Sequence, residues 1–229
     1  STPPHLITGL RLRPDEAPLR EGVSSPAVLE QRLDSLGRAD LFAGVVLVGR
    51  GERVLARKAV GLADRAKQVS MTPETRINIG SITKAFTGVA ILRLAQEGRL
   101  QLDEPIGRYV DGFPADVASR VTIRQLLQHR SGMGDFFPSP EFRADPSKVR
   151  TLDDYLRIAR STALEFEPGT RERYSNLGYV VLGAIVQVVS GTPWHEAIAE
   201  YVYRPAGMTS SGVYDRWASG IAQGYVGTP

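Results

Sequence analysis

Cysteine is absent from this sequence of 229 residues, and histidine occurs only three times, at His5, His129 and His195. The absence of cysteine excludes disulfide bonds, a cysteine nucleophile, iron–sulfur clusters and zinc sites with cysteine ligands. The three histidines lie far apart, and none belongs to an H-E-x-x-H pair. We therefore predict no metal site and no cofactor. A Ser-His-Asp triad would have only these three histidines as candidates for its base.

Lysine is scarce as well: it supplies four of the 28 basic residues, and arginine supplies the rest. The net charge is only +3, and no basic stripe is interleaved with aromatic residues, so we predict no nucleic-acid partner. The longest apolar stretch, Leu177 to Val189, has thirteen residues. A bilayer requires roughly 18–20, so we predict no membrane span.

Strand signals are also few, because only one hairpin can be read in the sequence. Its strands are expected at Phe42–Val48 and Arg53–Val60, after a helix that begins at Ser25-Pro26. The first strand is a continuous apolar run, typical of a central strand buried on both faces. Two strands seldom form a stable sheet alone. Either the fold is mostly helical, or the rest of the sheet lies outside this chain.

Helical signals are more numerous. A helix is expected from Ile82 to about Glu97, and an apolar helix extends to Val189 before Gly191. Two capping-box patterns predict the starts of further helices. These patterns pair Thr122 with Gln125, and Thr151 with Asp154.

The helix near Ser81 has an unusual composition, because Lys84 is the only charged residue in the twelve from Ser81 to Leu92. A helix that is apolar nearly all round is expected to be buried, and Lys84 with it. Burial of an unpaired ammonium ion costs several kcal/mol, so this lysine should be paired or partly deprotonated. Arginine could not lose its proton in this way.

Ser81 precedes Lys84 by one helical turn. A serine hydroxyl becomes a strong nucleophile when a nearby base takes its proton, and a deprotonated lysine can serve as that base. The N–H groups at a helix N-terminus would favour a developing oxyanion. The alternative is that Ser81 is an ordinary helix N-cap and that Lys84 extends to water.

A second motif, Tyr174-Ser175-Asn176, directly precedes the apolar helix. A tyrosine beside a lysine could carry a proton to and from a leaving group. The Asn176 amide offers a donor and an acceptor, which suits it to orient Lys84 and a substrate carbonyl. The alternative is a turn asparagine that caps the next helix, with Tyr174 as a core aromatic.

Together these motifs resemble the serine β-lactamase and penicillin-binding-protein-like superfamily, in the branch of class C β-lactamases and family VIII esterases. The similarity runs from about residue 40 to the end of the chain. It implies an α+β fold of the β-lactamase/transpeptidase-like type, with an antiparallel sheet flanked by helices and an inserted all-α region. The stretches that carry the resemblance are Gly80–Lys84, Leu126–Met133, Phe166–Thr170, Tyr174–Tyr179 and Arg204–Met208.

The resemblance implies a serine acyl hydrolase that acts on esters, β-lactams or peptides through an acyl-enzyme. The alternatives are a D-alanyl-D-alanine-type peptidase and a non-catalytic penicillin-binding-like module. Relatives are often exported, so a periplasmic or secreted location is favoured over a cytoplasmic one. The implied roles are Ser81 as nucleophile, Lys84 as base, Tyr174 as proton relay, Asn176 as orienting group, Phe136 and Phe137 as substrate-binding residues, and His129 as a structural brace.

One motif of the superfamily is missing: no K/H-T/S-G triplet occurs in this chain. The resemblance places that triplet and the remaining central strands after the last residue, so we expect an incomplete sheet. A third hypothesis is that the chain alone is inert, with a C-terminal fragment of the same protein as a candidate partner. The predicted segments are an N-terminal arm (1–24), a helix with two strands (25–80), the nucleophile helix and all-α region (81–205) and a connection toward the missing strands (206–229).

Overall fold

The computed structural model describes residues 25–214 and 220–224. The predicted arm at residues 1–24 and part of the predicted connection at 206–229 lie outside the described residues. The chain divides into two compact units, which we call the sheet unit and the helical unit. The sheet unit contains the described residues up to Ser81 together with those from Tyr214 onward, and the helical unit contains Ile82–Val213. The predicted α+β class is confirmed.

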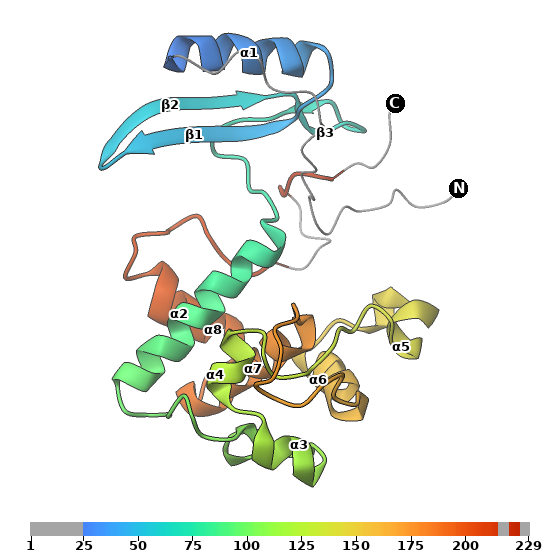
Figure 1. Ribbon diagram of the computed structural model, residues 1–229. Helices are drawn as coiled ribbons and strands as arrows, with labels where there is room; N and C mark the ends of the chain where they lie inside the picture. The colour runs from blue at the N-terminus through green and yellow to red at the C-terminus, as the bar shows by residue number, and fades with distance from the viewer. Residues whose placement is uncertain (1–24, 215–219, 225–229) are drawn as a thin grey trace. The chain divides into compact units, whose positions relative to one another are not determined.

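The sheet unit combines a helix with a β-hairpin (Figure 1). Helix α1 (Pro26–Arg38) begins after Ser25, whose side chain accepts a hydrogen bond from the Val28 N–H. Strands β1 (Gly44–Arg50) and β2 (Arg53–Val60) pair antiparallel, and α1 packs against β2. The predicted helix start and the predicted hairpin are therefore confirmed.

The prediction that the first strand is buried on both faces is wrong. In β1, Leu47 is 60% exposed and Val48 is 36% exposed. Among the described residues the hairpin forms a sheet of only two strands, so no third strand flanks β1. The expectation of an incomplete sheet is confirmed.

Two further short strands in the sheet unit were not predicted. Strand β3 (Leu62–Asp64) pairs antiparallel with β4 (Val69–Ser70). The described residues 220–224 belong to the same unit, where the Gln223 N–H donates to the Ala63 carbonyl and Ile221 forms a parallel bridge with Arg76. Residues distant in sequence thus complete the backbone hydrogen bonds that these short strands leave open.

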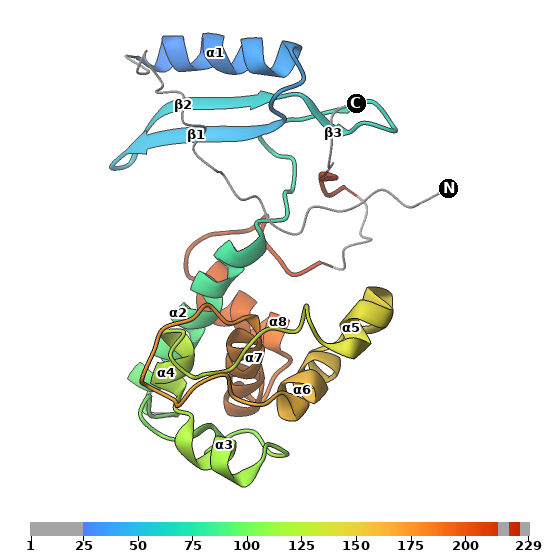
Figure 2. The same ribbon diagram turned by 45° about the vertical axis from the view of Figure 1, so that its right-hand side comes forward.

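The helical unit is organised around α7 (Asn176–Ser190), which contacts α2, α4, α6 and α8 (Figure 2). Its inward side chains, including Leu177, Leu182 and Ile185, are fully buried. Gly191 ends the helix with φ +76°, a conformation that favours glycine. The other helices are α2 (Thr83–Gln96), α3 (Ala115–Arg120), α4 (Ile123–Leu127), α5 (Pro140–Ala144), α6 (Leu152–Ser161), α8 (Trp194–Ile198) and the π-helical turn Ala199–Tyr203.

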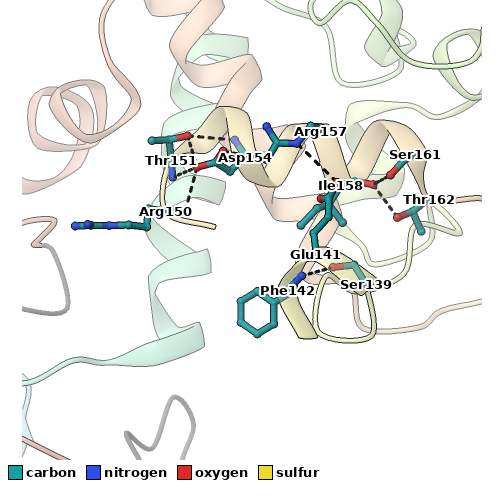
Figure 3. Close-up of polar contacts among 10 residues, drawn as sticks. All are labelled: Ser139, Glu141, Phe142, Arg150, Thr151, Asp154, Arg157, Ile158, Ser161 and Thr162. Carbon is teal, nitrogen blue, oxygen red and sulfur yellow. Dashed lines mark hydrogen bonds and ion pairs between the residues drawn. The ribbon is translucent and has the colours of Figure 1, made fainter. Parts of the chain in front are cut away.

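Both predicted capping boxes are present. At the start of α6, Thr151 Oγ1 accepts a hydrogen bond from the Asp154 N–H, and Asp154 Oδ2 accepts one from the Thr151 N–H (Figure 3). The Thr151 bonds, with a further one from the Arg150 N–H, hold the pKa of Asp154 well below its usual range. The same reciprocal pair joins Thr122 and Gln125 before α4.

The expectation that α2 is buried all round is wrong. Thr87, Ala90, Ile91 and Leu94 are buried, and α2 contacts α7, but Ile82, Val89 and Leu92 are 65%, 47% and 52% exposed. Within the residues that the structure covers, α2 packs against helices along one side only. No single described helix is long and apolar enough to cross a membrane; α7 and Trp194–Tyr203 pass this test as a pair but are bent by 82°.

Candidate active site

Ser81 lies in a tight turn that leads directly into α2. The Gly80 N–H donates to Asn78 Oδ1 at 2.8 Å, and Gly80 has φ +54°, where glycine is favoured. The turn Gly80–Ile82 is a 3₁₀ helix, and Lys84 is the second residue of α2. The N-cap of α2 is Ile82, which supplies no side-chain hydrogen bond, so Ser81 is not the N-cap of this helix.

The Lys84 side chain lies between α2 and the start of α7. Its Nζ donates to Asn176 Oδ1 at 2.7 Å and lies 4.8 Å from the centre of the Tyr174 ring and 5.6 Å from that of Tyr179. Both distances suit a cation–π interaction. Lys84 is half-buried rather than fully buried. The sequence predicts that Lys84 is either paired or partly deprotonated, and the structure shows that it is paired.

The Asn176 amide is held from both ends. Its Nδ2 donates to Asp135 Oδ2 at 2.7 Å, which directs Oδ1 toward Lys84. The N-cap of α7 is Ser175, whose Oγ accepts from the Gly178 N–H at 2.8 Å. The alternative in which Asn176 caps this helix is therefore wrong.

Tyr174 is not a core aromatic, because it is 50% exposed. Its ring lies 4.7 Å from the His129 ring, and His129 lies 5.1 Å from Tyr179. Burial raises the pKa of Tyr179. Tyr174 is thus held between Lys84 and His129 with part of its surface open to solvent.

His129 connects the segment before α7 to the loop after α4. Its Nδ1 accepts a hydrogen bond from the Ser175 N–H at 3.1 Å, which requires that nitrogen to be unprotonated. Burial lowers the pKa of His129, and the positive charge of Lys84 lowers it further, although Glu172 opposes this. These contacts agree with the structural role expected for His129.

The loop at residues 131–137 is tied to the same segment. Ser175 Oγ donates to the Gly134 carbonyl at 2.9 Å. Gly132 has φ +81° and approaches the Phe166 carbonyl so closely that an added Cβ would lie 2.3 Å from that oxygen. Glycine is therefore required for this loop to pack.

The two predicted substrate-binding phenylalanines differ in their surroundings. Phe136 is half-buried against the core of the helical unit, where it packs against Phe142 and Tyr155 at ring-centre distances of 5.1 and 4.8 Å. Phe137 is 46% exposed, and its N–H donates to Asp135 Oδ1 at 3.2 Å. The structure thus favours Phe137 over Phe136 as a side chain that is open to a ligand.

The structure brings Lys84, Tyr174 and Asn176 together from two helices and the segment that precedes α7. Ser81 is the last residue of the first part of the sheet unit, and the chain places it three residues before Lys84. Asp135 was not identified as a site residue from the sequence. Its one signal was its place in the Gly- and Pro-rich loop that also carries Phe136 and Phe137.

A separate cavity of about 570 Å³ lies elsewhere in the helical unit and contains none of the predicted site residues. It opens between α3 and the segment after α6. Its lining residues are Pro114, Asp116, Val117, Arg120, Arg160, Ser161, Thr162, Ala163, Leu164, Glu165, Phe166 and Glu167.

Several known proteins are similar to this chain in sequence and in fold. Penicillin-binding protein 4* of Bacillus subtilis is 31% identical over 190 residues, which is 82% of this chain and 42% of that protein. The structure of a penicillin-binding protein from Bacillus halodurans superposes with a TM-score of 0.74 at 32% identity, covering 82% of this chain and 58% of that one. EstCE1, described as a hydrolase with promiscuous acyltransferase activity, superposes with a TM-score of 0.70 at 29% identity, covering 85% and 55%.

The chain spans about two fifths of the length of the curated relatives that it matches. The family model described as Beta-lactamase matches residues 28–224, which includes every predicted site residue. The chain therefore belongs to the beta-lactamase family.

Proposed function

We propose that this protein is a serine acyl hydrolase that cleaves esters or amides through an acyl-enzyme on Ser81. One observation carries the proposal: the Lys84 amine, one helical turn after Ser81, is held by Asn176 beside the Tyr174 ring. A lysine on the surface would not need two partners from another part of the chain. The relatives named as penicillin-binding proteins and as a hydrolase support the same class of reaction.

In the first step, Lys84 Nζ, as the base, takes the proton of Ser81 Oγ while that oxygen bonds to the substrate carbonyl carbon. The carbonyl electron pair moves onto the carbonyl oxygen. The positive end of the dipole at the start of α2 favours this negative charge.

In the second step, the carbonyl re-forms and expels the alcohol or amine. The Tyr174 hydroxyl gives a proton to this leaving group and regains one from the Lys84 ammonium. Water then attacks the acyl-enzyme through the same groups in reverse, which releases the acid and restores Ser81. Asn176 holds the Lys84 nitrogen in place through both steps.

The proposal is tested by incubating the full-length protein with a fluorescent penicillin and with a p-nitrophenyl ester. We expect a covalent adduct and ester hydrolysis in the wild type and neither in Ser81→Ala. Ser119→Ala is a matched control, because Ser119 is an exposed serine that bonds only within α3. Unchanged labelling and turnover in Ser81→Ala would contradict the proposal.

The decay rate of the adduct separates the alternatives of peptidase and β-lactamase-like hydrolase. A penicillin adduct that persists while a D-alanyl-D-alanine peptide is cleaved would indicate the peptidase. Rapid loss of the adduct with ring-opened penicillin as product would indicate a β-lactamase. Turnover of the ester alone would indicate an esterase.

A further inference from the structure

We infer that Asp135 is a positioning residue, which fixes the Asn176 amide so that its oxygen faces the Lys84 nitrogen. This inference rests on the proposed function, because it assigns Asp135 a part in that reaction. The observation is a chain of two hydrogen bonds: Asp135 Oδ2 accepts from Asn176 Nδ2, and Asn176 Oδ1 accepts from Lys84 Nζ, each at 2.7 Å.

The chemistry of a carboxylate explains why an aspartate suits this position. A side-chain amide has a donor end and an acceptor end of nearly the same shape, so it can rotate by half a turn without a steric penalty. An ionised carboxylate only accepts hydrogen bonds, and it therefore selects the orientation in which Nδ2 of Asn176 points toward Asp135. The opposite orientation would aim Nδ2 at the Lys84 ammonium, where two donors would meet.

The second oxygen of Asp135 holds the carboxylate itself in place. Oδ1 accepts from the Phe137 N–H at 3.2 Å, and Asp135 is half-buried. The carboxylate therefore connects the Phe137 backbone to the Asn176 side chain.

The loop has a second attachment that does not involve Asp135. Ser175 Oγ donates to the Gly134 carbonyl at 2.9 Å, and the Ser175 N–H donates to His129 Nδ1. Replacement of Asp135 should therefore leave the backbone of the loop near its place. This separates a positioning role from a merely structural one.

A double-mutant cycle tests whether Asp135 acts through Asn176. We expect Asp135→Ala to lower kcat about tenfold, the effect of one charge-assisted hydrogen bond, while KM changes less than about threefold. In an Asn176→Ala background, the same change should alter kcat less than about twofold. Equal losses in both backgrounds would overturn the inference. Asp145→Ala is the matched control and should leave kcat unchanged, because Asp145 forms a similar turn but bonds to the Ser147 N–H and hydroxyl instead of to Asn176.

A measurement without turnover keeps this test separate from the proposed function. The sequence has only two asparagines, Asn78 and Asn176, so their side-chain amide NMR signals can be assigned with one variant of each. We expect Asp135→Ala to move the Asn176 signals and leave those of Asn78 in place. Unmoved Asn176 signals would refute the positioning role. Moved signals in a protein that never acylates Ser81 would refute the proposed function alone.

Discussion

The two units of the chain bury their apolar residues to different degrees. In the helical unit, α7 contacts four other helices, and several of its aliphatic side chains have no exposed surface. In the sheet unit, the hairpin has two strands, and Leu47 and Val54 are 60% and 55% exposed. A two-stranded sheet needs more strands or a covering layer for independent stability, whereas the helical unit already has a continuous core.

This difference matters for the site. Lys84, Tyr174, Asn176 and Asp135 all belong to the helical unit, so its core holds the polar groups in place independently of the sheet. Ser81, the proposed nucleophile, belongs to the sheet unit. The groups around Lys84 therefore share one continuous core, whereas Ser81 belongs to the unit whose hairpin sheet has two strands.

The largest effect is expected from Lys84→Arg, which keeps the positive charge and a donor for Asn176 but removes a group that can lose its proton. The acylation rate should fall about 10²–10⁴-fold, the usual contribution of a general base. Stopped-flow measurement with a fluorescent penicillin gives this rate. Lys58→Arg is the control from the sheet unit, since Lys58 pairs with Asp34 at 2.9 Å and should tolerate arginine. If both variants acylated at rates within tenfold of the wild-type rate, Lys84 would be ruled out as the base.

A pair of leucines compares the two cores directly. Leu182→Ala in α7 should lower the free energy of unfolding by about 2–5 kcal/mol, because a fully buried side chain leaves a cavity. Leu47→Ala in β1 should change it by less than about 0.5 kcal/mol, because Leu47 is already 60% exposed. Urea denaturation followed by circular dichroism measures both. A similar loss in both variants would show that the sheet unit is covered in solution.

The helix caps give a smaller difference of the same kind. Thr151→Ala removes one of the two reciprocal bonds at the start of α6 and should cost about 1–2 kcal/mol, and Thr151→Ser should restore most of it (Figure 3). Ser25→Ala removes the single cap bond of α1, which is exposed, and should cost about 0.5 kcal/mol. The same denaturation experiment compares the losses of unfolding free energy in the two alanine variants. A larger loss in Ser25→Ala than in Thr151→Ala would contradict this prediction.

The smallest effect concerns pH. The pKa of His129 is lowered from 6.5 in the folded protein, so the unfolded chain binds this proton first as pH falls. The contribution of His129 to stability is therefore complete above about pH 6.5 and declines as pH falls below it. His129→Asn retains an acceptor for Ser175 and tolerates φ +57°, and it should flatten this slope. His195→Asn, on the exposed surface of α8, should leave the dependence of stability on pH unchanged. If this variant flattened the dependence instead, His129 would not be its source.

Local signals predicted most of the fold. Pro26 after Ser25, the Thr151–Asp154 pattern and Gly191 each mark a helix end by their own backbone chemistry, and the structure confirms each boundary. Burial could not be predicted in the same way. Leu47 and Val89 are apolar, but their exposure depends on whether another layer of the fold covers them. The short strands β3 and β4 were missed because their pairing depends on a turn with little hydrophobic periodicity.

The candidate site was predictable where residues are adjacent in sequence. Ser81 with Lys84, and Tyr174 with Asn176, form short motifs whose chemistry can be read from their spacing. Asp135 could not be found in this way, because its role arises from a contact with a residue 41 positions later. The relation between His129 and Ser175 is likewise a product of the fold rather than of local sequence.

Peptide mapping of a trapped adduct is the most direct test of the nucleophile. Trypsin cleaves after Arg76 and Lys84, and the peptide between these cuts, Ile77–Lys84, contains only two hydroxyl side chains, Ser81 and Thr83. After treatment of the full-length protein with a fluorophosphonate, fragmentation of this peptide should locate the added mass on Ser81. An adduct on Thr83, an adduct on any other peptide, or no adduct at all would contradict the account.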